Sequence, residues 1–242
     1  MSIQKRVAVL QSSYIPWKGC FDIIHDVDLF IFYDDVQFTY QDWRSRNRIL
    51  TRSGPLWLTV PTGSDIKRNI NEVELRNPLW QKKHWASISQ SYAKAPHFRR
   101  YSEFFADLYL GKTWTLLSEM NQHFTRSIAS ELLGIDVQFE NSTAYAAEGR
   151  KLDRLLDLLR KAGATSYISG PAARDYIEPA RFEEAGIELL FKDYSGYPEY
   201  PQASSPFDHA VSVLDLIFNT GEAAPDHIWG WRKQADPRPT LA

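Results

Sequence analysis

The sequence contains a single cysteine, Cys20, among its 242 residues. An intrachain disulfide framework is therefore excluded, and we expect a reducing compartment, the cytoplasm. Long hydrophobic runs are also missing. No stretch approaches the roughly 20 apolar residues of a membrane helix, and "VAVL" near the N-terminus is too short for the core of a signal peptide. We therefore expect a protein that is not embedded in a membrane.

A strong net charge is missing as well. The 28 basic and 30 acidic residues leave a net charge of −2, so no overall field favours DNA as a partner. The sequence also lacks the Gly-x-Ser-x-Gly elbow of hydrolases, the lysine-containing P-loop and the Gly-x-Gly-x-x-Gly fingerprint of dinucleotide-binding proteins. The six histidines have no metal-ligand spacing, so we expect no zinc site.

The apolar runs that are present predict strands. Runs at 6–11 and 29–35 are nearly continuous in hydrophobicity, and the residues between them have helical spacing. This is typical of a parallel sheet that is covered on both faces and joined by a right-handed crossover. We expect a third strand at 55–61 and a fourth, edge strand at 70–76. Later strands are predicted at 136–142, 165–170 and 187–194, with helices at 150–163, near Glu184 and at 210–221.

These elements predict an α/β fold with a mostly parallel, Rossmann-like sheet and a helical insertion in the middle. The N-terminal α/β half covers 1–77, the helical segment 78–135 and the C-terminal α/β half 136–232. A last helix of the insertion, 113–134, carries one apolar stripe. We expect these parts to form one compact domain, followed by a flexible tail, 233–242.

Three polar segments follow predicted strands, where ligands of open parallel sheets bind. They are "QSSYIPWKG", "DDVQFTYQDWRSRNR" and "SGPAARDY", and we expect them to meet in one ligand site. In the first segment Pro16 restrains the backbone and Gly19 permits close approach to the start of a helix. Its candidate ligand-binding residues are Gln11, Tyr14, Trp17 and Lys18. Alternatively, Tyr14 and Trp17 plug the base of the helix layer, and Lys18 is solvent-exposed.

The second segment begins with Asp34 and Asp35. Successive side chains of a strand point to opposite faces, so one metal ion shared by both is not favoured. Either aspartate is a candidate general base, or it orients the arginines that follow. Alternating arginines line one face of an extended chain and suit a diphosphate, with surface salt bridges as the alternative. The candidate ligand-binding residues of this segment are Gln37, Arg44, Arg46, Asn47 and Arg48.

Three residues outside these two segments complete the candidates. His84 lies among polar residues and is a third catalytic candidate, unless its helix face is merely solvated. Ser169 follows the apolar run at 165–168 and is expected to reach the ligand. Asp215 lies on a mostly apolar helix, so it needs a partner such as an arginine of the second segment, unless it is only part of the scaffold.

The chain resembles the WbqC-like family of bacterial proteins over nearly its whole length. The resemblance rests on "LQSSYIPWKGCFDII", "DDVQFTYQDWRSRNRI", "LTVP", "KKHW" with "YAKAPHF", "SYISG" and "LDLIFNTG". Family members often have Pro or Gly after the glutamine, where this chain has Ser12-Ser13. Many members are encoded among genes for O-antigen and other surface-glycan biosynthesis. The resemblance implies a role in making a modified sugar, and it supplies no settled set of catalytic residues.

A more distant similarity concerns the chemistry. The layout of the first strand, turn, helix and second strand is similar to pantothenate synthetase and related nucleotidyltransferase-like folds, although their His-x-Gly-His signature is absent. This similarity implies ATP, with Mg²⁺, as a possible cofactor. We expect an enzyme of surface-polysaccharide biosynthesis that transfers an acyl or aminoacyl group to the amine of a nucleotide-linked amino sugar. The alternatives are a non-catalytic nucleotide-sugar or glycan-binding protein and an ATP-dependent ligase. The sequence also permits a homo-oligomer.

Overall fold

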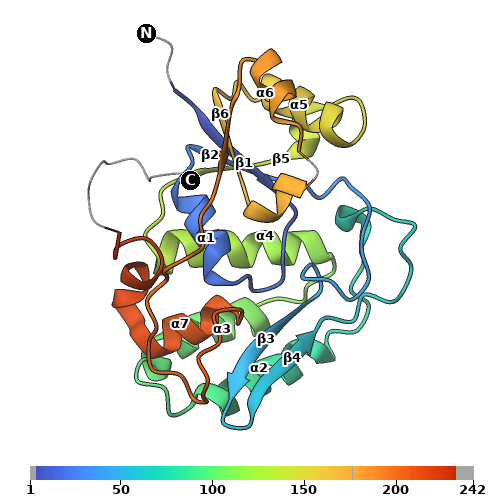
Figure 1. Ribbon diagram of the computed structural model, residues 1–242. Helices are drawn as coiled ribbons and strands as arrows, with labels where there is room; N and C mark the ends of the chain where they lie inside the picture. Colours follow the sequence, from blue (N-terminus) through green and yellow to red (C-terminus); the bar gives the residue numbers. More distant parts are fainter. Residues whose placement is uncertain (1–3, 176, 233–242) are drawn as a thin grey trace.

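The computed structural model describes residues 4–175 and 177–232, and its centre is a five-stranded parallel sheet (Figure 1). The strands lie in the order β5-β2-β1-β6-β7. Their bounds are Arg6–Leu10 for β1, Leu29–Phe32 for β2, Gln138–Asn141 for β5, Ser166–Ser169 for β6 and Glu188–Phe191 for β7. The predicted α/β fold with a mostly parallel sheet is therefore confirmed. The predicted tail, 233–242, lies outside the described residues.

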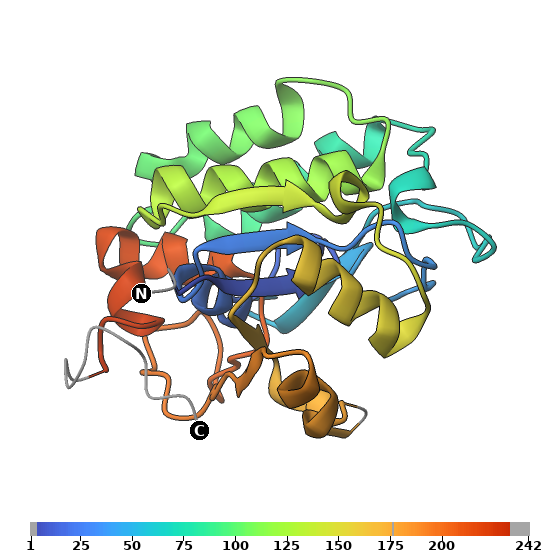
Figure 2. The same cartoon turned by 90° about the horizontal axis from the view of Figure 1, so that it is seen from above.

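Helices cover both faces of this sheet (Figure 2). On one face α1, α4 and α7 pack against sheet residues such as Ala8 and Phe30. On the other face α5 and α6 pack against Val7 and Leu29. The helices are α1 (Lys18–His25), α2 (Leu79–Tyr92), α3 (Phe98–Leu110), α4 (Leu117–Ser127), α5 (Lys151–Lys161), α6 (Pro179–Glu184) and α7 (Val213–Thr220). All four residues of β2 are buried because both faces are covered, which explains its continuous hydrophobicity.

The last helix of the helical insertion is shorter than the predicted helix 113–134. α4 ends at Ser127, and a π-helical turn, Ile128–Leu132, continues it. The stripe formed by Leu117, Met120, Phe124 and Ile128 is buried in the core, as the spacing indicates. None of the helices in the described ranges combines the length and the apolar composition needed to cross a bilayer.

The predicted third and fourth strands of the sheet are wrong. β3 (Arg46–Thr51) and β4 (Gly54–Thr59) instead form a separate antiparallel hairpin, which includes most of the predicted strand 55–61. Residues 70–76 begin with a 3₁₀ turn, because the Asn69 and Glu72 side chains form a capping box. Beyond that turn, Glu74 makes one isolated bridge to Leu116 and pairs with no strand.

The strand order creates a switch point between β1 and β6. From β1 the chain passes through α1 to β2 on one side, and β6 later pairs with β1 on the other side. The segments that leave β1 and β6 therefore diverge and open a crevice beyond the carboxyl ends of these strands.

Candidate functional site

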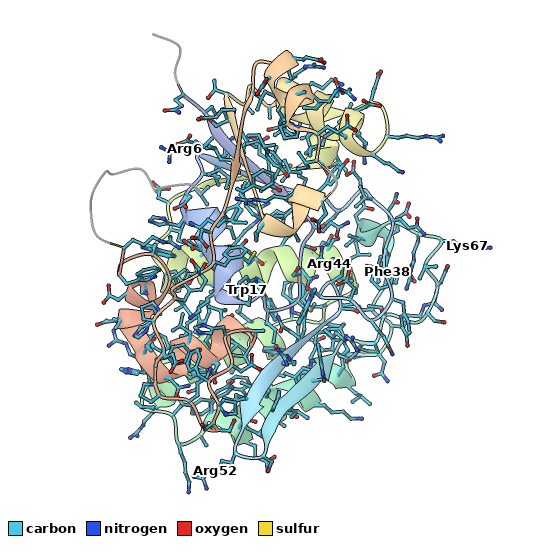
Figure 3. All side chains as sticks on the ribbon, in the orientation of Figure 1. Arg6, Trp17, Phe38, Arg44, Arg52 and Lys67 are labelled. Atoms are coloured by element: carbon cyan, nitrogen blue, oxygen red, sulfur yellow. The ribbon has the colours of Figure 1, made fainter. Side chains whose placement is uncertain are left out.

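A cavity of about 1120 Å³ lies at this switch point, and we call it the switch-point cavity. Its volume is slightly above the usual range of small-molecule sites, roughly 300 to 1,000 Å³. Figure 3 shows Trp17 and Arg44 in the middle of the molecule, between the parallel sheet and the hairpin. The segments after β1, before and at the start of β3, at the start of α5 and after β6 supply Gln11, Ser13, Pro16, Trp17, Trp43, Arg44, Asn47, Lys151, Leu152, Gly170 and Ala172 to its lining.

A strained turn forms the wall after β1. Ile15 has a φ of 34°, which is a genuine outlier for a β-branched residue. Hydrogen bonds hold this conformation: Asn47 Nδ2 donates to the carbonyls of Tyr14 at 3.1 Å and of Ile15 at 2.8 Å. The Tyr14 N–H donates to the carbonyl of Trp43 at 2.9 Å. Asn47, a predicted ligand-binding residue, therefore lines the cavity and also fixes the turn.

The Trp17 side chain folds back over the first turn of α1. A Cβ atom on Gly19 would lie 2.3 Å from the Trp17 ring, so only glycine fits there. The ring also packs edge-on against Tyr194, with centroids 4.9 Å apart. Trp17 lines the cavity, and its indole occupies the space beside Gly19. Its role in ligand binding stays a prediction.

Arg44 is the arginine of the second segment that faces the cavity. Its Nη1 donates to Gln11 Oε1 at 2.5 Å, so two predicted ligand-binding residues are in direct contact. The Arg44 Nε is buried and has no hydrogen-bond partner in the ranges that the structure describes. Burial lowers the pKa of the Arg44 guanidinium. A half-buried guanidinium that lines a cavity suits phosphate or carboxylate.

Arg46 and Arg48 lie on the hairpin and do not line the cavity. The Arg46 guanidinium stacks on the Trp57 ring, 4.4 Å from its centroid. Arg48 contacts the same ring at 5.6 Å and pairs with Asp208 at 3.4 Å. The three arginines therefore do not meet at one ligand, because Arg44 lies before the first residue of β3 and turns inward.

Asp34 and Asp35 point to different partners. Asp34 accepts hydrogen bonds from the Ser12 N–H and from Gln122 Nε2, both at 2.8 Å. Its burial raises the pKa of its carboxyl group. Asp35 pairs with Arg154 at 2.5 Å. Both aspartates line a smaller pocket of about 200 Å³ at the ends of β2 and β5, and neither lines the switch-point cavity.

His84 is part of a buried hydrogen-bond chain. Its Nδ1 lies 2.8 Å from the Tyr14 hydroxyl, which lies 2.5 Å from the Tyr109 hydroxyl. Burial lowers the pKa of His84 to about 4, so the ring is neutral at pH 7. Tyr14 is completely buried, as in the alternative that it plugs the helix layer. The catalytic assignment of His84 stays a prediction, and His84 does not line the cavity.

The remaining predicted residues also lie outside the cavity lining. The Lys18 ammonium is buried among the rings of Tyr197 (4.8 Å), Tyr200 (5.5 Å) and Phe207 (5.7 Å). The expected arginine partner of Asp215 is wrong: Tyr200 Oη and Gln202 Nε2 donate to it at 2.9 and 2.8 Å. Ser169 is buried at the end of β6, and Gln37 donates to the carbonyl of Ile66 at 3.2 Å.

Four chemically capable residues of the cavity lining were missed from the sequence. They are Trp43, Tyr194, Lys151 and Glu178. Trp43 stands directly before Arg44 in the polar segment that follows the predicted strand 29–35. That position could have indicated it as a residue of the site. Lys151 begins α5 with a φ of 49°, shortly after Gly149 with a φ of 89°, and only the glycine signals this unusual backbone.

The lining combines apolar rings with one guanidinium, one ammonium and one carboxylate. Cys20 also lines it, but burial raises the pKa of the thiol to about 12, so a thiolate nucleophile is not favoured at pH 7. Within the described ranges, no group of three or more His, Cys, Asp or Glu side chains could hold a metal ion. The guanidinium and the ammonium beside apolar rings suit binding of an anionic organic molecule.

These features define an α/β protein with a large, partly cationic cavity at the switch point of a parallel sheet. The chain belongs to the WbqC-like protein family, whose model matches residues 11–227. The chain is 42% identical over 226 residues to the uncharacterized protein Rv1507c of Mycobacterium tuberculosis. These matched residues cover 93% of this chain and 97% of the relative. No solved structure matches the chain.

Proposed function

We propose that the protein binds a nucleotide-linked amino sugar in the switch-point cavity and transfers an acyl or aminoacyl group to its amine, as a step of surface-polysaccharide biosynthesis. The observation that carries the proposal is Arg44, which presents a half-buried guanidinium to a cavity of about 1120 Å³ at the switch point. Nucleotide ligands of open α/β sheets bind at this position. The volume accommodates a sugar and a nucleoside diphosphate together.

The cations would hold the diphosphate. Arg44 and Lys151 both line the cavity, Arg44 just before β3 and Lys151 at the start of α5. A guanidinium and an ammonium on one diphosphate balance its charge. Gln11 already restrains the Arg44 side chain, which reduces the entropy lost when an anion binds.

The transfer itself needs a proton acceptor, because a sugar amine is mostly protonated at neutral pH. Glu178 is the carboxylate of the cavity lining, so the proposal assigns it as the general base in place of Asp35 or His84. The amine nitrogen attacks the acyl carbonyl carbon and a C–N bond forms. Glu178 accepts the first proton, from the ammonium, and this frees the nitrogen lone pair for the attack. The bond to the donor's leaving group then breaks, the leaving group keeps the electron pair, and it takes up the second proton that the nitrogen loses.

The test measures binding and turnover with a panel of amino-sugar nucleotides and acyl donors. Arg44→Met is expected to weaken nucleotide-sugar binding roughly 10- to 100-fold, as for a lost hydrogen bond to a charged group. Arg52→Met is the matched control, because Arg52 is exposed in the turn of the hairpin and does not line the cavity, and it should bind normally. Glu178→Gln should bind normally and lose turnover.

Other outcomes separate the alternatives. A protein that binds nucleotide sugars but modifies none of them, and that keeps its pathway function with Glu178→Gln, is the non-catalytic binder. Exchange of isotope between ATP and pyrophosphate in the presence of an acid indicates the ATP-dependent ligase. If no amino-sugar nucleotide raises the unfolding temperature while other ligands do, the proposed substrate class is wrong.

A further inference from the structure

Three side chains form a stack that ends at the mouth of the switch-point cavity. The Arg46 guanidinium lies 4.4 Å from the Trp57 centroid, and the Trp57 and Trp43 rings lie 5.6 Å apart with 35° between their planes. Trp43 and Trp57 are each 43% exposed. Trp43 is also part of the cavity lining, and Trp57 is not. The stack is therefore ordered from the hairpin toward the cavity as Arg46, Trp57, Trp43.

The backbone of Trp43 is held in place on both sides. Its carbonyl accepts the N–H of Tyr14 from the strained turn after β1, and its own N–H donates to Asp42 Oδ1 at 2.5 Å. Trp57 belongs to β4 of the hairpin (Figure 1) and supports the indole from the other side. Two large exposed rings beside a cavity, one of them fixed by strand-exit hydrogen bonds, are typical of a ligand-binding surface.

We propose that Trp43 is the stacking platform for the base of the nucleotide that enters the switch-point cavity. The inference rests on the proposed function only in taking a nucleotide as the ligand, and it does not require acyl transfer. Every nucleobase has a flat π face, and stacking on an aromatic side chain accepts any of them. Arg44 follows Trp43 directly and also lines the cavity. Consecutive residues thus offer a flat ring to the base and a cation to the phosphates. In a nucleotide, one ribose separates the base from the phosphates.

A pyranose ring is the competing occupant of the same indole face, and the variants are chosen to separate the two. Phenylalanine at position 43 keeps a π face for a base, whereas leucine keeps only apolar bulk. The probes are UDP, dTDP and ADP, with inorganic pyrophosphate as a probe that has no base and N-acetylglucosamine as a probe that has only a sugar. Binding of each probe to the full-length chain is measured by calorimetry.

We expect at least one nucleoside diphosphate to bind more tightly than pyrophosphate. Trp43→Leu should weaken that nucleotide roughly 10- to 100-fold, as for the loss of one base–aromatic stack. Trp43→Phe should lose much less, and pyrophosphate affinity should stay unchanged in both variants. Tyr40→Leu is the matched control, because Tyr40 is an exposed ring of the same loop outside the cavity lining, and it should bind as the wild type does.

Trp57→Leu gives an independent check, since it removes the support of the platform without removing the platform. It should weaken the nucleotide less than Trp43→Leu and leave pyrophosphate unchanged. The inference is overturned if no nucleoside diphosphate binds better than pyrophosphate, if Trp43→Leu binds as the wild type does, or if N-acetylglucosamine is the probe that depends on Trp43. Trp43-dependent nucleotide binding without acyl transfer supports the platform and refutes the proposed reaction. Acyl transfer that is unchanged by Trp43→Leu supports the proposed reaction and refutes the platform.

Discussion

Replacing Lys18 by methionine is expected to stabilise the protein at pH 7. The Lys18 side chain is 3% exposed, and its ammonium has no hydrogen-bond partner within the described part of the chain. Burial lowers the pKa of Lys18 from 10.5 to about 8, against the opposing effects of Asp215 and Asp22. Both aspartates keep other partners in the variant, since Tyr200 donates to Asp215 and Arg232 pairs with Asp22.

The size of the effect follows from that pKa difference. At about 1.4 kcal/mol per pH unit, a fall from 10.5 to about 8 corresponds to a cost of about 3 kcal/mol for the charged form in the folded state. Cation–π contacts of the ammonium with the three surrounding rings offset about 1 to 2 kcal/mol of this cost. A long apolar side chain in the same place has neither contribution, so Lys18→Met should gain about 1 to 2 kcal/mol.

The pH dependence has a definite sign. Because the folded-state pKa is the lower one, the unfolded chain binds more protons between about pH 8 and 10.5. Lys18 therefore adds to the free energy of unfolding as the pH rises through that window, and its cost is fully present below pH 8. The advantage of Lys18→Met should be largest near pH 7 and should shrink toward pH 10.

Urea unfolding of both proteins at pH 7 and pH 10 measures these differences. Lys192→Met is the contrasting control, because the equally buried Lys192 ammonium pairs with Asp22 at 2.8 Å and also with Asp26. Removing it leaves Asp22 with Arg232 and leaves the buried Asp26 carboxylate with His25 alone, and should cost about 3 kcal/mol. The reasoning fails if Lys18→Met is less stable than the wild type at pH 7, or if the difference between the two is the same at both pH values.

Three further predictions concern the wall of the cavity and its support. Gly19→Ala should destabilise the fold by about 1 to 3 kcal/mol and shift Trp17 fluorescence, because the new methyl overlaps the indole; unchanged urea unfolding would contradict this. Asn47→Ala should cost about 2 kcal/mol in the same assay and weaken ligand binding, since it frees the turn at Ile15. His84→Gln should remove part of the acid sensitivity. The folded-state pKa of His84, about 4, lies below the ordinary 6.5, so His84 costs the wild type stability as the pH falls from 6.5 to about 4, and the glutamine variant should lose less.

The parallel sheet could be predicted because both faces of its strands are buried. The runs at 6–11 and 29–35 contain β1 and β2, and their continuous hydrophobicity follows directly from the two helix layers. The run at 55–61 has a similar composition, yet it pairs only with β3 in the hairpin. Composition alone does not separate these cases, because the pairing partner of a strand is decided by long-range contacts.

The sequence predicted which segments meet at the candidate site better than it predicted which side chains face the cavity. Loops after parallel strands meet at a switch point, so the segments containing Trp17 and Arg44 were expected to lie together, and both line the cavity. The direction of each side chain depends on local backbone that the sequence does not specify. Ile15 in the left-handed region changes the course of the chain after β1. Lys18, three residues later, consequently points into the core rather than to a ligand.

Ser12 and Ser13 have two different structural roles. The Ser12 N–H donates to the buried carboxylate of Asp34 at 2.8 Å. A glycine at this position keeps that donor, whereas a proline has none and leaves Asp34 with Gln122 alone. Ser13 instead lines the switch-point cavity. A change at position 12 therefore alters the hydrogen bonds to Asp34 beneath the end of β1. A change at position 13 alters the lining of the cavity. Only a change at position 13 should alter which ligand is bound.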